Sequence, residues 1–218
     1  MEKKAQIHLW TAVGTAICCW FLMFSPWTST RINFWVAMSL SAICLTLFSV
    51  VGLHYRHDES EAEPASAWLK NASRHLLRGI VIGALLWSLF WLGDKISSLI
   101  FDFARPQVDS IYGMKQGLPP WAIALLLLVL IGPAEEYFWR GYVQRSLAAT
   151  IGENRAFVTT TAIYTLIHIW SFNFMLIMAA MVCGVVWGGL YRLKPQWLPA
   201  LVISHALWDA CVFVVFPI

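Results

Sequence analysis

The sequence predicts an all-α, polytopic membrane protein with about seven transmembrane helices. Hydrophobic residues make up 59% of the 218 residues and charged residues only 12%, and the mean hydropathy is +0.66. A helix rises about 1.5 Å per residue, so about 20 apolar residues cross about 30 Å of hydrocarbon. This composition excludes an ordinary soluble domain, and the thirteen tryptophans are expected mainly as interfacial anchors and lipid-facing bulk.

Seven apolar stretches are long enough to span a bilayer. They are residues 7–26, 32–53, 76–100, 118–142, 155–170, 174–191 and 198–216. The first stretch has no small-residue cleavage site and is followed at once by another span, so we interpret it as a retained helix rather than a signal peptide. The fifth and sixth are separated by residues 171–173 alone, which predicts a tight antiparallel hairpin.

The distribution of basic residues predicts the orientation. Eleven of the 15 lysines and arginines fall on the same side of the predicted spans as the N-terminus, and only four fall on the other, namely Arg31, Lys95, Arg105 and Lys115. Cytoplasmic loops hold the excess of positive charge, so we expect a cytoplasmic N-terminus in the plasma (inner) membrane. The net charge of +3 is explained by this topology and by lipid head groups, and no nucleic-acid partner is expected.

Charged side chains interrupt the fourth span. Glu135, Glu136 and Arg140 follow the almost wholly apolar residues 122–131. An ionisable side chain at the centre of a membrane helix costs about 2.5–3.5 kcal/mol on insertion scales and turns toward a partner or a water-filled cavity. Glu136 and Arg140 are spaced i,i+4 and can pair, whereas Glu135 is rotated by about 100°. The segment is therefore the leading candidate for a functional site, and Gly132 and Pro133 before it are expected to loosen the helix.

Two later spans carry matching polar residues. His168 ends the fifth, and His205 and Asp209 lie i,i+4 in the seventh, so the aspartate can orient the imidazole or hold it protonated. The helical rise places Glu135, His168 and His205 at similar depth, and we expect them to meet in one layer that is reached from the cytoplasmic side. A carboxylate with a facing imidazole can activate water, and His205 can bind an oxyanion. This chemistry favours hydrolysis of a carbonyl compound inside the membrane.

Other functions remain open from the residues alone. Glu135, His168 and His205 could hold zinc with an open position for water, although the chain has no HExxH motif. Buried Glu, His and Asp chains also relay protons in proton-coupled transporters, but no inverted repeat is visible. A third alternative is a non-catalytic membrane scaffold or immunity protein that binds a peptide in the same cavity.

The order of the motifs resembles a known family. From about residue 118 to the C-terminus, the chain is similar to the type II CAAX prenyl endopeptidase and bacteriocin-processing (CPBP, or Abi) family of intramembrane glutamic proteases. The motifs that carry the resemblance are Glu135-Glu136-x-x-x-Arg140, Tyr164-x-x-x-His168 and His205-x-x-x-Asp209. The resemblance implies a catalytic membrane core over residues 118–218, preceded by transmembrane helices and a cytoplasmic loop over residues 1–117.

The resemblance also implies roles for the site residues. Glu135 would be the general base that activates water together with His168, Glu136 and Arg140 would support the site, and His205 would bind the oxyanion beside residue 209. No cofactor is expected, with zinc as the second choice. The substrate would be a membrane-anchored protein or peptide precursor, with a cut close to its C-terminus as one option.

Two positions depart from the family pattern. Tyr164 stands where phenylalanine is usual, and Asp209 stands where asparagine is usual. An asparagine amide donates a hydrogen bond, whereas an ionised aspartate cannot. Three alternatives therefore stay open: Asp209 is protonated, it keeps His205 cationic, or the substrates differ from prenylated proteins.

Overall fold

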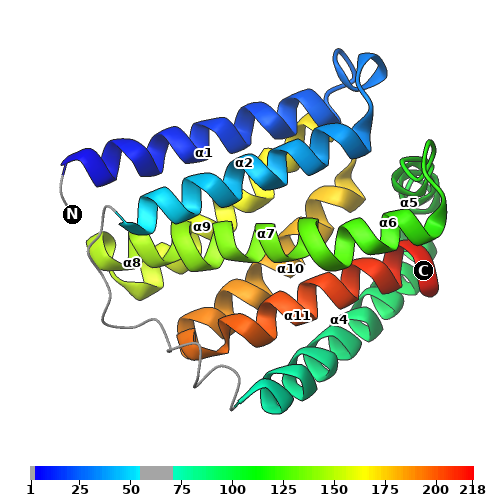
Figure 1. Cartoon of the computed structure of the whole chain (residues 1–218). Helices are drawn as coiled ribbons and strands as arrows, with labels where there is room; N and C mark the ends of the chain where they lie inside the picture. The colour runs from blue at the N-terminus through cyan, green and yellow to red at the C-terminus, as the bar shows by residue number, and fades with distance from the viewer. Residues whose placement is uncertain (1–2, 55–70) are drawn as a thin grey trace.

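Long apolar helices lie side by side in the computed structural model, which describes residues 3–54 and 71–218 (Figure 1). These residues form helices and no strand. The cytoplasmic loop expected within residues 1–117 falls at residues 54–67, almost wholly outside the described residues. The first helices are α1 (Lys3–Phe24), η1 (Ser29–Arg31), α2 (Phe34–His54), α4 (Ala72–Ile100) and α5 (Ala104–Gly113).

The second half of the chain consists of helices that change type along their length. One continuous rod contains α6 (Pro120–Leu126), the π-helix η2 (Leu127–Ile131), α7 (Gly132–Glu136), the π-helix η3 (Tyr137–Gln144) and α8 (Arg145–Ile151). It is followed by α9 (Glu153–Leu166), the 3-10 helix η4 (Ile167–Ser171), α10 (Phe174–Leu193), η5 (Pro195–Trp197), α11 (Leu198–Ala210) and the π-helix η6 (Cys211–Val215).

Six helices within the described ranges are long and apolar enough to cross a membrane, which confirms the polytopic all-α prediction. They are Lys3–Phe24, Phe34–His54, Ala72–Ile100, Pro120–Ile151, Phe174–Leu193 and Pro195–Val215. The predicted span 155–170 is not among the six, because α9 has only 14 residues and continues as the 3-10 helix η4. A run of three threonines, Thr159–Thr161, makes its middle less apolar than the other spans.

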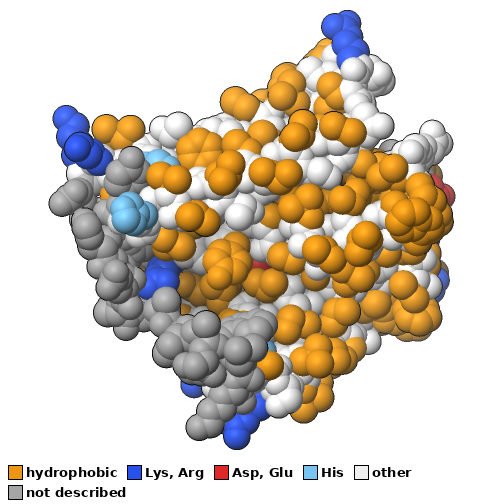
Figure 2. Space-filling view, viewed as in Figure 1, with side chains coloured by type: hydrophobic (Ala, Val, Ile, Leu, Met, Phe, Trp, Pro, Cys, Tyr) orange, Lys and Arg blue, Asp and Glu red, His pale blue; other side chains and the backbone are white. Residues whose placement is uncertain are grey.

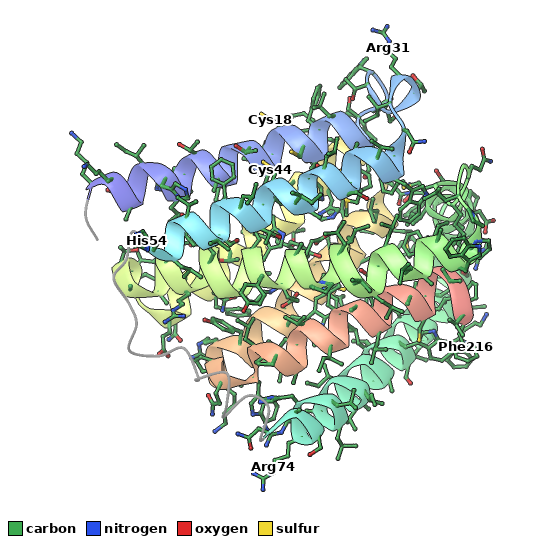
Figure 3. The ribbon with its side chains drawn as sticks, viewed as in Figure 1. Cys18, Arg31, Cys44, His54, Arg74 and Phe216 are labelled. Atoms are coloured by element: carbon green, nitrogen blue, oxygen red, sulfur yellow. The ribbon has the colours of Figure 1, made fainter. Side chains whose placement is uncertain are left out.

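Although short, α9 and η4 carry the chain from one end of the bundle to the other. The two termini consequently lie at opposite ends (Figure 1). His54 and Arg74 lie toward the end that holds the N-terminus, whereas Arg31 and Phe216 lie toward the other (Figure 3). Apolar side chains cover the long helices between the ends, and lysines and arginines gather at the ends themselves (Figure 2). This distribution is typical of a protein surrounded by lipid.

Small residues bring the helices of the second half close together. A Cβ atom on Gly132 would lie 2.8 Å from the Cα atom of Ala206, so α7 and α11 approach to backbone contact there. Gly184 and Gly188 of α10 likewise pack against α9, with Thr161 and Phe157 as their nearest neighbours there. The GxxxG pattern of α10 thus takes part in packing within the chain.

The turn between η4 and α10 forms the predicted hairpin. Phe172 adopts the left-handed conformation with φ 49°, which reverses the chain direction. Asn173 then caps α10, because its side-chain oxygen accepts a hydrogen bond from the Leu176 N–H at 2.9 Å.

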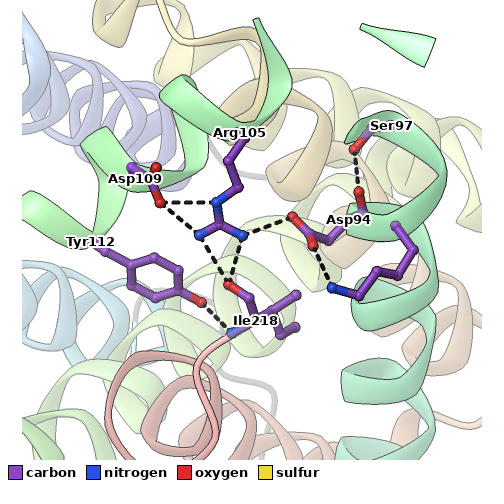
Figure 4. A network of polar contacts seen from close by, with 7 residues as sticks. Asp94, Ser97, Arg105, Asp109, Tyr112 and Ile218 are labelled. Carbon is purple, nitrogen blue, oxygen red and sulfur yellow. Dashed lines mark hydrogen bonds and ion pairs between the residues drawn. The ribbon is translucent and has the colours of Figure 1, made fainter. Parts of the chain in front are cut away.

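The short helix α5 is fastened at the end of the bundle where the C-terminus lies (Figure 4). Arg105 donates hydrogen bonds to Asp109 at 2.7 Å, to Asp94 of α4 at 3.4 Å and to the Ile218 carbonyl at 3.3 Å. The Tyr112 hydroxyl accepts a hydrogen bond from the Ile218 N–H at 2.8 Å. The network joins α4, α5 and the last residue of the chain.

Candidate active site

The predicted site residues come from four elements and meet inside the bundle. Glu135 and Glu136 lie on α7, Arg140 on η3, His168 on η4, and His205 and Asp209 on α11. Each is at most 8% exposed. Glu135, His168, His205 and Asp209 line one cavity of about 120 Å³, and Glu136 and Arg140 lie outside its lining.

Glu136 is neutralised by two cationic or protonatable neighbours. Its Oε1 accepts a hydrogen bond from Arg140 Nη1 at 2.6 Å and lies 2.9 Å from His205 Nδ1. Arg140 also lies over the rings of Tyr164 and Trp187, at 4.9 Å and 5.7 Å from their centroids. A buried charge is tolerated only when it is paired in this way, so the predicted i,i+4 pair is present and linked to α11.

Glu135 has different surroundings, although it is the next residue. Its Oε2 lies 3.4 Å from the Tyr164 hydroxyl, which donates to it. Among the described residues, Arg140 pairs with Glu136 rather than with Glu135. The helical rotation between neighbours turns Glu135 into the cavity while Glu136 faces the arginine. The tyrosine that departs from the family pattern therefore contacts the candidate base directly.

His205 lies between two carboxylates. Its Nδ1 faces Glu136 and its Nε2 lies 3.4 Å from Asp209 Oδ2. Only the imidazolium has a proton on both nitrogens, so the cationic form satisfies both contacts. The ring is also stacked on Trp187, with centroids 3.9 Å apart and an interplanar angle of 20°, and an aromatic face stabilises a cation.

His168 is held by two hydrogen bonds on opposite sides of its ring. Its Nδ1 lies 2.8 Å from the Tyr164 carbonyl oxygen. Trp20 of α1 donates its indole N–H to His168 Nε2 at 3.0 Å. Both ring nitrogens are therefore engaged by the protein.

Irregular helix geometry positions the two glutamates. The π-helices η2 and η3 lie directly before and after the five-residue α7, and π-helical turns are frequent at functional sites. Pro133 has no N–H to donate, which fits a change of hydrogen-bond pattern at this point. The predicted loosening of the helix at Gly132 and Pro133 thus takes the form of a switch between helix types.

Part of the cavity wall lies near the end of the bundle opposite the N-terminus. Its wall includes Phe24 at the end of α1, Phe34 at the start of α2 and Met114 just after α5. These helix ends lie opposite the N-terminus (Figure 1). Access from the cytoplasmic side stays a prediction, and His168 lies near the turn that leads into α10 rather than in mid-span.

A larger apolar cavity adjoins the first. It has a volume of about 350 Å³ and is bounded by α4, α5, α10 and α11. Ile111, Leu176, Ala179, Trp208 and Phe213 line both cavities. The polar site therefore borders a wide apolar space under α5.

The donor atoms do not fit a zinc site in this arrangement. Zinc requires the free lone pairs of several ligands, whereas His168 and His205 each have both nitrogens directed at protein groups. Across residues 3–54 and 71–218, no three His, Cys, Asp or Glu side chains are grouped to hold a metal ion.

Sequence reasoning missed the tryptophans of the site. Trp20 and Trp187 are at most 1% exposed, although the tryptophans were expected mainly at interfaces and facing lipid. Trp187 lies between Gly184 and Gly188 in sequence, and this small-residue pattern could have indicated a close-packed face. No local signal distinguishes Trp20 from a lipid-facing tryptophan.

Comparison with known proteins agrees with the motifs. Residues 117–211 match the family model described as type II CAAX prenyl endopeptidase Rce1-like. The match includes all six predicted site residues and confirms the resemblance. No curated protein and no solved structure matches the chain.

Proposed function

Because residues 117–211 match the type II CAAX prenyl endopeptidase Rce1-like family model, we propose that this protein is an intramembrane endopeptidase with a metal-free, glutamate-based mechanism. It hydrolyses a peptide bond in a membrane-associated protein or peptide precursor. The observation that carries this proposal is the unequal environment of two adjacent glutamates. Glu136 is paired with Arg140 and His205, whereas Glu135 lines the cavity.

Glu135 acts as the general base. A carboxylate whose hydrogen-bond partner is a neutral phenol keeps its basicity better than one in an ion pair. Glu135 therefore takes the proton from a water in the cavity, and the water oxygen attacks the carbonyl carbon of the substrate. The tetrahedral oxyanion then forms on the side of the cavity that α11 contributes. It collapses when the C–N bond breaks and Glu135 returns the proton to the leaving amine.

His205 stabilises that oxyanion. A hydrogen bond between a charged N–H and a carboxylate is usually about 2.7–2.9 Å long, so the 3.4 Å separation of His205 Nε2 from Asp209 is a weak contact that a substrate oxygen can replace. Asp209 and Glu136 keep the ring cationic, which is the second of the three alternatives left open by the sequence. The aspartate thus acts through His205 and need not donate a hydrogen bond itself.

The substrate is an apolar segment near the membrane, cut within or close to the bilayer and, we propose, near its C-terminus. The 350 Å³ cavity beside the site has almost wholly apolar walls, so it accommodates apolar side chains of such a segment. The basic-residue distribution supports a plasma (inner) membrane location with a cytoplasmic N-terminus, and the site then faces the outer half of the membrane.

The test is cleavage of a pooled library of membrane-anchored peptides by purified wild type and Glu135→Gln. General-base catalysis contributes about 10²–10⁴-fold, so we expect the variant to lose cleavage by that factor. Glu153→Gln is the matched control, because Glu153 is an exposed glutamate in the first turn of α9. Equal cleavage by wild type and Glu135→Gln would overturn the mechanism. Absence of any cleavage by folded wild type would favour the scaffold or transporter alternatives.

A further inference from the structure

Trp20 and His168 meet across the boundary of the family-matched segment. Trp20 lies on α1, far outside the matched residues 117–211, yet its indole N–H is 3.0 Å from His168 Nε2. The rings are edge-on, with centroids 5.9 Å apart. Trp20 is 1% exposed and His168 7% exposed, so water does not compete freely for this contact.

The two hydrogen bonds of His168 determine where its proton lies. The Tyr164 carbonyl only accepts, so His168 Nδ1 must carry the proton in the 2.8 Å contact. An indole only donates, so Nε2 must present its lone pair to Trp20. A second proton on Nε2 would place two donors against each other in a buried site. In this arrangement His168 is the neutral Nδ1–H tautomer.

We propose that Trp20 is a positioning residue of the protease site, which fixes the tautomer and ring orientation of His168 so that its only basic nitrogen is Nε2. A water that His168 helps to activate must then take the place of the Trp20 N–H at that nitrogen. This inference rests on the proposed function, and it makes α1 part of the catalytic unit although the family match does not include it.

Not every buried indole in the described residues has a hydrogen-bond partner. Trp139 and Trp208 also have buried N–H groups, and neither finds a hydrogen-bond partner among the described residues. Trp139 is 0% exposed and packs edge-on against Trp20 at 6.4 Å. The substitution Trp139→Phe therefore removes an indole of similar burial from the same cluster, without removing a hydrogen bond to His168.

The first readout is independent of activity. Protein with ¹⁵N-labelled histidine rings is reconstituted in lipid nanodiscs, and the His168 signals are assigned with His168→Gln. We expect a protonated Nδ1 and an unprotonated Nε2 in wild type and in Trp139→Phe, unchanged between about pH 5 and 8. In Trp20→Phe the freed Nε2 acquires a proton at the acidic end of that range. A wild-type spectrum with the proton on Nε2 would overturn the proposal, even if Trp20→Phe fails to fold.

The titratable groups around His168 are the same in wild type, Trp139→Phe and Trp20→Phe. A difference in the pH response of His168 therefore reports the loss of the Trp20 indole N–H. The groups that line the cavity with His168 are Glu135 of α7, Tyr164 of α9, Cys183 of α10, and His205 and Asp209 of α11. Within the described residues, α1 and α2 contribute only Phe24, Phe34, Trp35 and Met38 to this lining.

The second readout is the rate of Glu135-dependent cleavage of the library peptide that wild type cuts fastest. One hydrogen bond is worth about 1 kcal/mol, so we expect kcat to fall about fivefold in Trp20→Phe, with KM unchanged. Trp139→Phe keeps its kcat. A kcat for Trp20→Phe equal to that of Trp139→Phe, or above wild type, would overturn the positioning role. If no Glu135-dependent cleavage is found, the proposed function fails and the NMR readout still decides the tautomer.

Discussion

At the scale of single residues, the site depends on how charge is compensated without water. Glu136, Arg140 and His205 form a connected group in which one carboxylate oxygen accepts from two donors. Removing one partner from a buried ion pair leaves an uncompensated charge, which costs about 3–5 kcal/mol. Glu135 has no such pairing to maintain, because the group that donates to it is the neutral Tyr164 hydroxyl.

The two adjacent glutamates should therefore respond differently to the same substitution. We expect Glu136→Gln to lower the free energy of unfolding by about 3–5 kcal/mol, because Arg140 and His205 lose their shared carboxylate. Glu135→Gln should leave stability nearly unchanged while lowering cleavage by about 10²–10⁴-fold. Thermal unfolding of both purified variants in one detergent measures the difference. Equal destabilisation would contradict the division of roles between the two residues.

Residue patterns predicted part of this site. The i,i+4 spacings indicated the Glu136–Arg140 pair and the His205–Asp209 contact, because helical geometry alone brings such side chains together. The contacts of Trp20, Trp187 and Tyr164 were not predicted. They join helices that are distant in sequence, and spacing within one helix says nothing about which neighbour it meets.

At the scale of elements, the distance between α7 and α11 determines how closely Glu136 and His205 approach each other. Gly132 lets the two backbones touch just before the glutamates, and the contact is at Ala206, next to His205. A larger residue there must push the helices apart. The Glu136–His205 hydrogen bond, which joins the same two helices, would lengthen with them.

We expect Gly132→Ala to destabilise the protein by about 1–3 kcal/mol, because a methyl group at 2.8 Å from backbone atoms cannot be accommodated without movement. Cleavage should fall as well. Gly14→Ala of α1 is the control, since nothing lies within 4 Å of its Cβ position, and there alanine favours the helix by about 1 kcal/mol. We expect the unfolding temperature to fall in Gly132→Ala and to rise in Gly14→Ala. A shift in the same direction in both variants would contradict close α7–α11 packing.

Helix α5 gives a separate prediction. Arg105 is 44% exposed, and exposed ion pairs contribute little to global stability. We therefore expect Arg105→Ala to leave the unfolding temperature nearly unchanged and to speed amide exchange locally in Ala104–Gly113. Hydrogen exchange with mass spectrometry measures this, with the exposed Arg31→Ala as control. Unchanged exchange in α5 would show that the network in Figure 4 does not hold the helix.

Periodicity and hydropathy predicted these elements well, with one exception. Apolar length is sufficient to identify a helix that is surrounded by lipid, as in α1, α2, α4 and α10. It did not predict how residues 155–170 end, where the α-helix stops at Leu166 and η4 turns His168 into the cavity. The π-helical turns around α7 were also beyond sequence patterns, because they depend on packing between helices.

At the scale of the whole molecule, the long helices and the shorter α9–η4 segment together place the termini at opposite ends (Figure 1). The matched segment supplies all six predicted site residues. Helices α1 and α2 close one side of the cavity with Phe24, Phe34, Trp35 and Met38. We propose that residues 1–117 and 118–218 are not two independent structural units, and that both are needed to form the catalytic unit.

The proposed orientation can be tested from the two ends of the bundle. Arg31 lies in η1 between α1 and α2, Lys194 directly follows α10, and both side chains are exposed. We expect Arg31→Cys to react with a membrane-impermeant maleimide in intact cells. Lys194→Cys should react only after the membrane is permeabilised. The reverse pattern would place the N-terminus outside.

The central claim is that Glu135 activates water without a metal. The most direct measurement is kcat/KM for one defined peptide, taken from the library, with wild type and Glu135→Gln after removal of metals by a strong chelator. The account predicts that chelated wild type keeps its full rate and that Glu135→Gln loses about 10²–10⁴-fold. A chelated wild type that loses activity and regains it with zinc would contradict the claim.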